Sequence, residues 1–283
     1  MTLFEQQQAE FTNRHIGPTE AEIAAMLKTI GVSSMDELIN KTVPAAIRLE
    51  VPLNTGGPIS EYDYLAELKR TAGLNKVYKN YIGRGYYSPI VPSVILRNVF
   101  ENPGWYTQYT PYQAEIAQGR LESLLNFQTM VSDLTALPIA NASLLDEGTA
   151  AAEAMAMLFN HKNKDTDHIT APKFFVDELI FDQTKDILIT RAKPIHVELV
   201  FGDYKTIELT EDFFGAIVQY PNSDGLVVDY KKFIEKAHAV NALVVMASDL
   251  LSLTLLTPPG ELGADVAIGN SQRMGVPLGF GGP

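Results

Sequence analysis

The sequence contains no cysteine. This absence excludes disulfide bonds, thiolate nucleophiles and cysteine-ligated zinc, and it fits a protein that works in a reducing compartment. The 283 residues are enough for one large domain or two modest ones. With 46% hydrophobic residues, the chain has the composition of an ordinary globular protein rather than a disordered one.

Positive charge is also scarce, because 22 Lys and Arg stand against 34 Asp and Glu and give a net charge of −12. Such a charge repels nucleic-acid phosphates and anionic lipids. The first residues show no basic segment followed by an apolar one. The most apolar stretch, Ala242–Leu256, is too short to span a bilayer and contains Asp249. We therefore expect a soluble, cytoplasmic protein with no nucleic-acid and no membrane partner.

Several common catalytic patterns are missing. There is no Gly-x-Gly-x-x-Gly motif and no Walker-type lysine. The five histidines never occur three or four residues apart, so the sequence predicts no metal site. The run Gly269–Arg273 is similar to a nucleophile elbow, but Arg273 takes the place of the second glycine, which argues against a serine hydrolase.

Helix signals dominate residues 1–80, which we predict to form a helical N-terminal arm. Thr19 and Glu22 make a capping box, in which hydroxyl and carboxylate each accept from a free backbone amide. A helix starting near Ser60 is expected to turn its apolar side chains, such as Tyr64 and Leu65, inward. The arm carries no visible catalytic chemistry.

Residues 81–283 show a different pattern, in which short apolar strands alternate with helices from Pro138 onward. Such alternation predicts parallel crossovers, and hence an α/β domain whose mainly parallel sheet has helices on both faces. The expected strands are 139–142, 168–171, 196–200, 216–220, 243–247 and 265–268. The expected helices between them are 148–160, 177–192 and 229–240.

Two local features of this domain indicate a ligand site or, equally simply, helix caps. Gly148 and Thr149 open a helix after a predicted strand, where free amides and the helix dipole accept a phosphate. Asp249 follows the apolar run 243–247, so it should lie at the carboxyl end of a parallel strand, where a carboxylate can pair with a cationic ring nitrogen. Both acidic and hydroxyl side chains at these positions are also ordinary N-terminal caps.

The amino-acid sequences of several segments are more specific than these two features. Through them the whole chain resembles the P-protein family of the glycine cleavage system. The segments are RHIGP (14–18), YIG (81–83), QYTPYQ (108–113), QGRLESLL (118–125), NASLLDEGTA (141–150) and QRMGVP (272–277). Met274 departs from the aromatic residue expected at its position. The resemblance is to the amino-terminal half of that family.

The resemblance implies a fold-type I pyridoxal-phosphate transferase domain and a role in glycine catabolism. In that family an oxidoreductase, glycine decarboxylase, uses pyridoxal 5'-phosphate to decarboxylate glycine and passes the aminomethyl group to the lipoyl arm of H-protein. The cofactor lysine belongs to the carboxyl-terminal half or to a second subunit. The implied partners are therefore that half or subunit, H-protein and glycine, in a homodimer or a heterotetramer. The chain is expected to be truncated at the carboxyl-terminal end of its large domain.

The residues themselves support a half without a bound cofactor. Fold-type I chemistry, which the resemblance implies, needs a lysine amine after the strand-end aspartate to form the Schiff base, yet Lys236 is the last lysine of the chain. The resemblance implies that Gln272 and Arg273 stand where the cofactor-binding half carries its His-Lys pair, and a guanidinium stays protonated. We expect Gly148, Thr149, Asp249 and Arg273 to be vestigial cofactor-pocket positions, with no cofactor bound covalently and no activity in the chain alone.

The expected contribution of the chain is dimer contacts and part of a shared active-site wall. The candidates for that wall are four tyrosines in turn-rich loops ahead of the sheet, namely Tyr86, Tyr87, Tyr109 and Tyr112. The alternative is a non-catalytic regulatory or scaffolding pseudoenzyme of the same fold. A third hypothesis, an independently active phosphate-cofactor enzyme, requires a lysine that the sequence does not supply.

Overall fold

A computed structural model gives the fold. It describes residues 2–7, 15, 17–49, 51, 53–81, 83, 88–106, 113–141, 144–164 and 169–279. The chain divides into two compact units, Met1–Asn80 and Tyr81–Pro283, which are described separately below.

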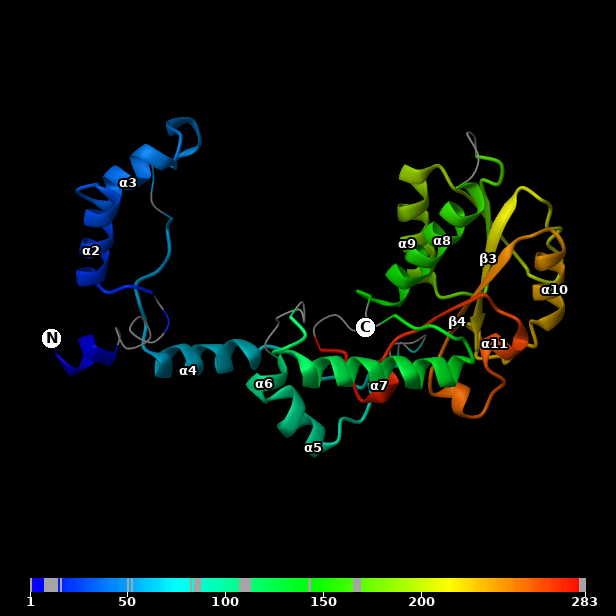
Figure 1. The fold of residues 1–283 in the computed structure, drawn as a ribbon. Helices are drawn as coiled ribbons and strands as arrows, with labels where there is room; N and C mark the ends of the chain where they lie inside the picture. The colour runs from blue at the N-terminus through cyan, green and yellow to red at the C-terminus, as the bar shows by residue number, and fades with distance from the viewer. Residues whose placement is uncertain are drawn as a thin grey trace. The chain divides into compact units, whose positions relative to one another are not determined.

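The N-terminal unit consists of short helices (Figure 1), and several of them have side-chain caps. They are α2 (Glu20–Ile30), α3 (Met35–Thr42), the 3₁₀ turn η1 (Ala45–Ile47) and α4 (Glu61–Ala72). The predicted capping box is confirmed, because Thr19 accepts from the Glu22 amide and the Glu22 carboxylate accepts from the Thr19 amide at 2.7 Å. Ser60 caps α4 in the same way through the Asp63 amide.

The prediction that α4 buries its apolar side chains was wrong. Tyr64 is 52% exposed, Leu65 56% and Leu68 48%. No described residue from 2 to 80 is buried, so the described part of this unit has no hydrophobic core of its own. The spacing of apolar residues correctly indicated helices, but it carries no information on whether anything covers them.

The first part of the second unit is helical. A single α-turn, α5 (Ser93–Ile95), continues into the π-helix η2 (Leu96–Phe100), followed by α6 (Pro103–Tyr106). The long helix α7 (Gln118–Thr135) comes next and ends where Ala136 adopts a left-handed conformation with φ of 54°.

A five-stranded parallel sheet forms the centre of the second unit. Its order is β2-β1-β3-β4-β5, and every neighbouring pair is parallel. The strands are β1 (Lys173–Asp177), β2 (Glu198–Gly202), β3 (Phe213–Tyr220), β4 (Leu243–Ser248) and β5 (Val266–Ile268). The helices α9 (Asp182–Ala192), α10 (Lys231–Ala239) and α11 (Pro259–Leu262) lie in the connections between strands.

Helices cover both faces of this sheet, as predicted (Figure 1). Side chains alternate along each strand, so Phe174 of β1 packs with α8 (Glu147–Asn163) and α9, while the next residue, Phe175, packs with α10. On β4, Val245 likewise belongs to the cluster on the α8 and α9 face, and Met246 belongs to the cluster on the α10 face. All eight residues of β3 are buried, which explains why its sequence is apolar apart from Gln219.

The largest differences from the prediction lie ahead of and around the first strand. Residues 139–141 form no strand and Ile139 is 86% exposed, while the rest of that predicted strand lies outside the described residues. The first strand is β1 at 173–177 rather than 168–171, and Asp177 ends it instead of opening a helix. The aromatic run Phe174-Phe175 fits a strand that is buried on both faces. This buried packing, rather than the preceding apolar residues, determines where the strand lies in the sequence.

Candidate functional site

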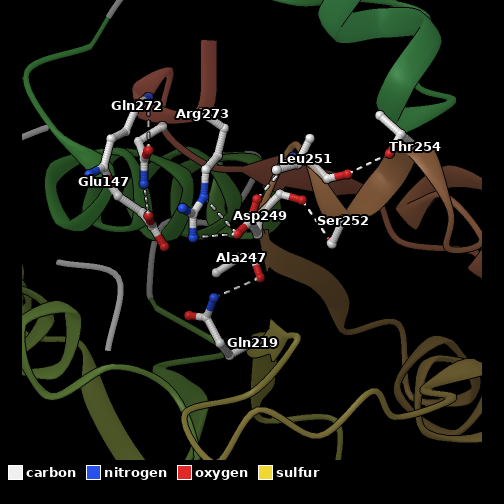
Figure 2. A network of polar contacts seen from close by, with 10 residues as sticks. Glu147, Gln219, Ala247, Asp249, Leu251, Ser252, Thr254, Gln272 and Arg273 are labelled. Carbon is white, nitrogen blue, oxygen red and sulfur yellow. Dashed lines mark hydrogen bonds and ion pairs between the residues drawn. The ribbon is translucent and has the colours of Figure 1, made fainter. Parts of the chain in front are cut away.

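The carboxyl ends of the strands surround a cavity of about 340 Å³. Its walls come from the start of α8, the ends of β3 and β4, and the loop after β5. Figure 2 shows polar side chains of this lining, among them Glu147, Gln219, Asp249 and Arg273. Ligands of open parallel sheets bind at this edge, so it is the candidate site.

Asp249 and Arg273, which the sequence singled out separately, form an ion pair at this edge. Asp249 follows β4, as predicted, and its Oδ2 accepts from Nε of Arg273 at 3.1 Å and lies 3.0 Å from Nη2. Its Oδ1 accepts from the Leu251 amide at 2.9 Å. Both oxygens of Asp249 are therefore engaged within the chain, one by a guanidinium and one by a backbone turn.

The start of α8 is closed by its own side chains. Asp146 is the N-cap, and its Oδ1 accepts from the Thr149 amide at 2.6 Å. Gly148 is buried, and a Cβ at this position would collide with the Ile187 side chain of α9. Asp146 and Thr149 therefore act as a helix cap, which was one of the two interpretations of this segment. Gly148 allows α8 and α9 to pack closely.

Glu147 is the residue of this helix start that reaches the cavity. Its Oε2 accepts from Nδ2 of Asn270 at 2.6 Å, and Asn270 in turn accepts from the Gln272 amide (Figure 2). Removal from water raises the pKa of Glu147, and the nearby charge of Asp249 adds to this, while the Asn270 amide lowers it. Surrounding protein thus desolvates a carboxylate that is still accessible from the cavity.

Two buried side-chain amides at the site were not predicted from the sequence. Gln219, 2% exposed near the end of β3, donates from Nε2 to the Ala247 carbonyl at 3.1 Å, but its Oε1 has no partner among the described residues. Asn222, 3% exposed, accepts from two backbone amides of its turn, and within the described chain its Nδ2 has no acceptor. A glutamine inside an otherwise apolar strand was the signal that could have revealed the first.

The remaining predicted site residues are not placed. Tyr86, Tyr87, Tyr109 and Tyr112 lie outside the described residues. Within the described ranges, no group of three or more His, Asp or Glu side chains is arranged to hold a metal ion. None of the helices described is both long and apolar enough to cross a membrane.

Comparison with known proteins identifies the family. Residues 13–283 match the family model described as "Glycine cleavage system P-protein". The chain is 58% identical over 274 residues to glycine dehydrogenase (decarboxylating) of Nostoc sp., which covers 96% of this chain and 27% of that protein. The enzyme of the same name from Bacteroides fragilis is 52% identical over 270 residues, covering 95% and 28%. The chain spans about a quarter of the length of these curated relatives.

A solved structure agrees with these matches. The crystal structure of a glycine decarboxylase (P-protein) of the glycine cleavage system, in inhibitor-bound form, superposes with a TM-score of 0.84 and 33% identity. The match covers 95% of this chain and 61% of that one. It confirms the predicted α/β fold with a helical N-terminal region. The chain belongs to the glycine cleavage system P-protein family.

Proposed function

We propose that this chain is a component of glycine decarboxylase. The complete enzyme would release carbon dioxide from glycine and transfer the aminomethyl group to the lipoyl group of H-protein. The support is the similarity to relatives named glycine dehydrogenase (decarboxylating). Because the chain spans about a quarter of their length, the activity is assigned to an assembly with the remaining part, either fused or as a second subunit.

Pyridoxal phosphate, the cofactor that the family implies, does not fit the residues at this sheet edge. A phosphate at the start of α8 would meet the carboxylates of Asp146 and Glu147 instead of free amides. No lysine occurs among the described residues that line the cavity, and none follows Lys236 in the sequence. We therefore assign the cofactor and its lysine to the remaining part of the enzyme.

The observation that carries this assignment is the ion pair of Asp249 with Arg273. A strand-end carboxylate that holds a cationic ring nitrogen must have a free oxygen toward the ring, whereas here the guanidinium occupies Oδ2. The pair is partly exposed, so its charges are screened, and its role is to occupy the Asp249 carboxylate rather than to add much stability. Gly148, Thr149, Asp249 and Arg273 are then vestiges of a cofactor pocket.

The positive role that we propose for the chain is structural. Residues 1–80 would act as an arm and residues 81–283 as a transferase-like large domain that makes dimer contacts. The tyrosines Tyr86, Tyr87, Tyr109 and Tyr112 would supply part of the wall of an active site shared with the cofactor-bearing half.

Exchange of label between bicarbonate and the carboxyl group of glycine tests the proposal. The chain is assayed with pyridoxal phosphate and lipoylated H-protein, alone and together with the remaining part of the enzyme. We expect background exchange from the chain alone and robust exchange from the complete assembly. Borohydride reduction followed by peptide mapping should place the pyridoxyl group on the other part only. A specific adduct on this chain with turnover would contradict the assignment, and assembly without exchange would favour a regulatory pseudoenzyme.

Two substitutions examine the parts separately. Tyr109→Phe in the assembly should lower the exchange rate if the hydroxyl contributes to the wall, with Tyr62→Phe in the exposed arm helix as the matched control. Arg273→Ala should leave the cofactor absorbance of the assembly intact, because the cofactor is bound elsewhere. Loss of that absorbance without loss of folding would show that this edge holds the cofactor after all.

A further inference from the structure

We propose that the cavity at the carboxyl edge of the sheet binds a small ligand carrying a primary ammonium group next to a hydrogen-bond acceptor. This site goes beyond the proposed function, because it does not involve the pyridoxal cofactor. It concerns a cavity that is lined by described residues of this chain.

The first support is the pair of buried amides with unused groups. Oε1 of Gln219 is an acceptor and Nδ2 of Asn222 is a donor, and neither has a partner among the described residues. Both side chains are more than nine-tenths buried and both line the cavity. Figure 2 shows the Gln219 amide at the end of β3, extending toward the side chains of Glu147 and Asp249. A buried polar group without a partner costs about 1–3 kcal/mol, which a bound ligand with matching groups would recover.

The second support is the charge around the cavity. Glu147, Asp249 and the nearby Asp146 contribute three carboxylates, and Arg273 is the single cationic side chain among the described lining residues. Arg273 is held by Asp249, and the described partners of Glu147 are the neutral amides of Asn270 and Gln219. Since Glu147 has no cationic partner within the described chain, a cation is the complementary ligand.

The two supports together select the chemistry. An ammonium group has three donors, which can satisfy the Glu147 carboxylate and Gln219 Oε1 at once. An acceptor on the same ligand, one or two bonds away from the ammonium group, can accept a hydrogen bond from Nδ2 of Asn222. The volume of about 340 Å³ lies at the lower end of the range for small-molecule sites, so a small amine fits better than a nucleotide.

Ethanolamine is the probe that tests the proposal, because it joins an ammonium group to one hydroxyl. Isothermal titration calorimetry on the full 283-residue chain should show saturable, one-to-one binding in the millimolar range. Ethylene glycol lacks the charge and tetramethylammonium lacks the N–H donors, so both should bind at least tenfold more weakly.

Glu147→Gln is the decisive variant. It should weaken ethanolamine binding at least tenfold while raising the melting temperature of the ligand-free chain, since a neutral amide replaces a desolvated carboxylate. Loss of binding caused by misfolding would instead lower that temperature. The matched control is Glu153→Gln on the same helix, where the carboxylate pairs with Arg191 on the surface, and binding should not change.

A second variant keeps the test independent of Glu147. Gln219→Met removes the unused acceptor at nearly constant volume and should weaken ethanolamine severalfold. The proposal is overturned if the native chain shows no saturable heat, if tetramethylammonium or ethylene glycol binds as well as ethanolamine, or if the folded Glu147→Gln variant binds unchanged.

Discussion

The N-terminal and C-terminal units both contain well-capped helices, but only the second unit buries them. Thr19 and Ser60 cap α2 and α4, yet no residue of either helix is buried. In contrast, α8 begins with an equally good cap, Asp146, and buries eight of its residues against the sheet and α9. Local signals therefore decide where a helix begins, whereas its stability in the protein comes from the surface on which it packs.

The comparison extends to charge. The arm places its ionised groups on the surface, where they pair locally, as Glu37 does with Lys41 at 2.6 Å. The sheet unit encloses Asp177 completely, and one of its oxygens has no partner in the described chain. A carboxylate therefore has opposite effects on stability in the two units.

The largest expected effect that tests this contrast is a truncation in the core. Phe214 is fully buried on β3, where its ring stacks on Phe174 at 5.1 Å and meets the edge of Phe159 at 5.3 Å. Phe214→Ala should lower the free energy of unfolding by about 3–5 kcal/mol, since it leaves a cavity in rigid surroundings. Urea denaturation followed by circular dichroism measures this loss.

Leu65→Ala in the arm is the matched truncation. Leu65 is 56% exposed, so the change should alter the free energy of unfolding by no more than about 0.5 kcal/mol. Equal losses from Phe214→Ala and Leu65→Ala would show that the arm has a core after all, and would remove the contrast between the units.

The next effect in size concerns the buried carboxylate. Removal from water raises the pKa of Asp177 from its ordinary 3.8 to about 6, and the Leu179 amide offsets only part of this. Because the folded-state pKa lies above the unfolded one, stability falls as the pH rises from about 4 to about 6 and stays low above that. Asp177→Asn should therefore stabilise the chain on the order of 2 kcal/mol at neutral pH and hardly at all near pH 4.

Urea titrations at several pH values check this prediction. The control is Asp186→Asn, which changes an exposed aspartate of the neighbouring helix α9 and should leave the pH profile as it is. A stabilisation by Asp177→Asn that is equal at both ends of the pH range would contradict the assignment of the effect to ionisation.

Sequence reasoning succeeded where the signal was local or strongly buried. The Thr19–Glu22 capping box and the apolar runs of β3 and β4 were predicted because each rests on neighbouring residues. The apolar residues near Ile139 were misread as a strand, because hydrophobicity alone does not reveal whether a neighbouring strand is available for pairing.

The candidate site was only partly predictable for the same reason. Asp249 and Arg273 were each marked by their motifs, but the bond between them joins residues 24 positions apart and depends on the order of the strands. Gln219 and Asn222 carry no motif, and their importance appears only when the fold leaves one group of each without a partner among the described residues.

A smaller effect is expected at the cap of the first arm helix. Thr19→Ala removes one acceptor of the capping box and should destabilise α2 by about 1 kcal/mol. Hydrogen exchange of the α2 amides, read by mass spectrometry, should become several times faster. Thr29→Ala is the matched control, because its hydroxyl donates to the Ala25 carbonyl within the same helix and caps nothing. Similar acceleration by both variants would mean that the cap does not hold this helix.

The smallest effect belongs to the exposed carboxylate of α3. Lys41 and, to a lesser extent, Ser33 lower the pKa of Glu37 to about 2, so its stabilising contribution is present above pH 4.5 and is lost as the pH falls through about 2. Glu37→Gln should therefore speed hydrogen exchange of the α3 amides slightly at neutral pH, and less so in concentrated salt, which screens the pair. Glu20→Gln in the first turn of α2, a glutamate without a described lysine partner, should show a weaker response to salt. An effect of Glu37→Gln that persists unchanged in high salt would mean that hydrogen bonding to Ser33, rather than the charge of Lys41, is what the arm gains from this residue.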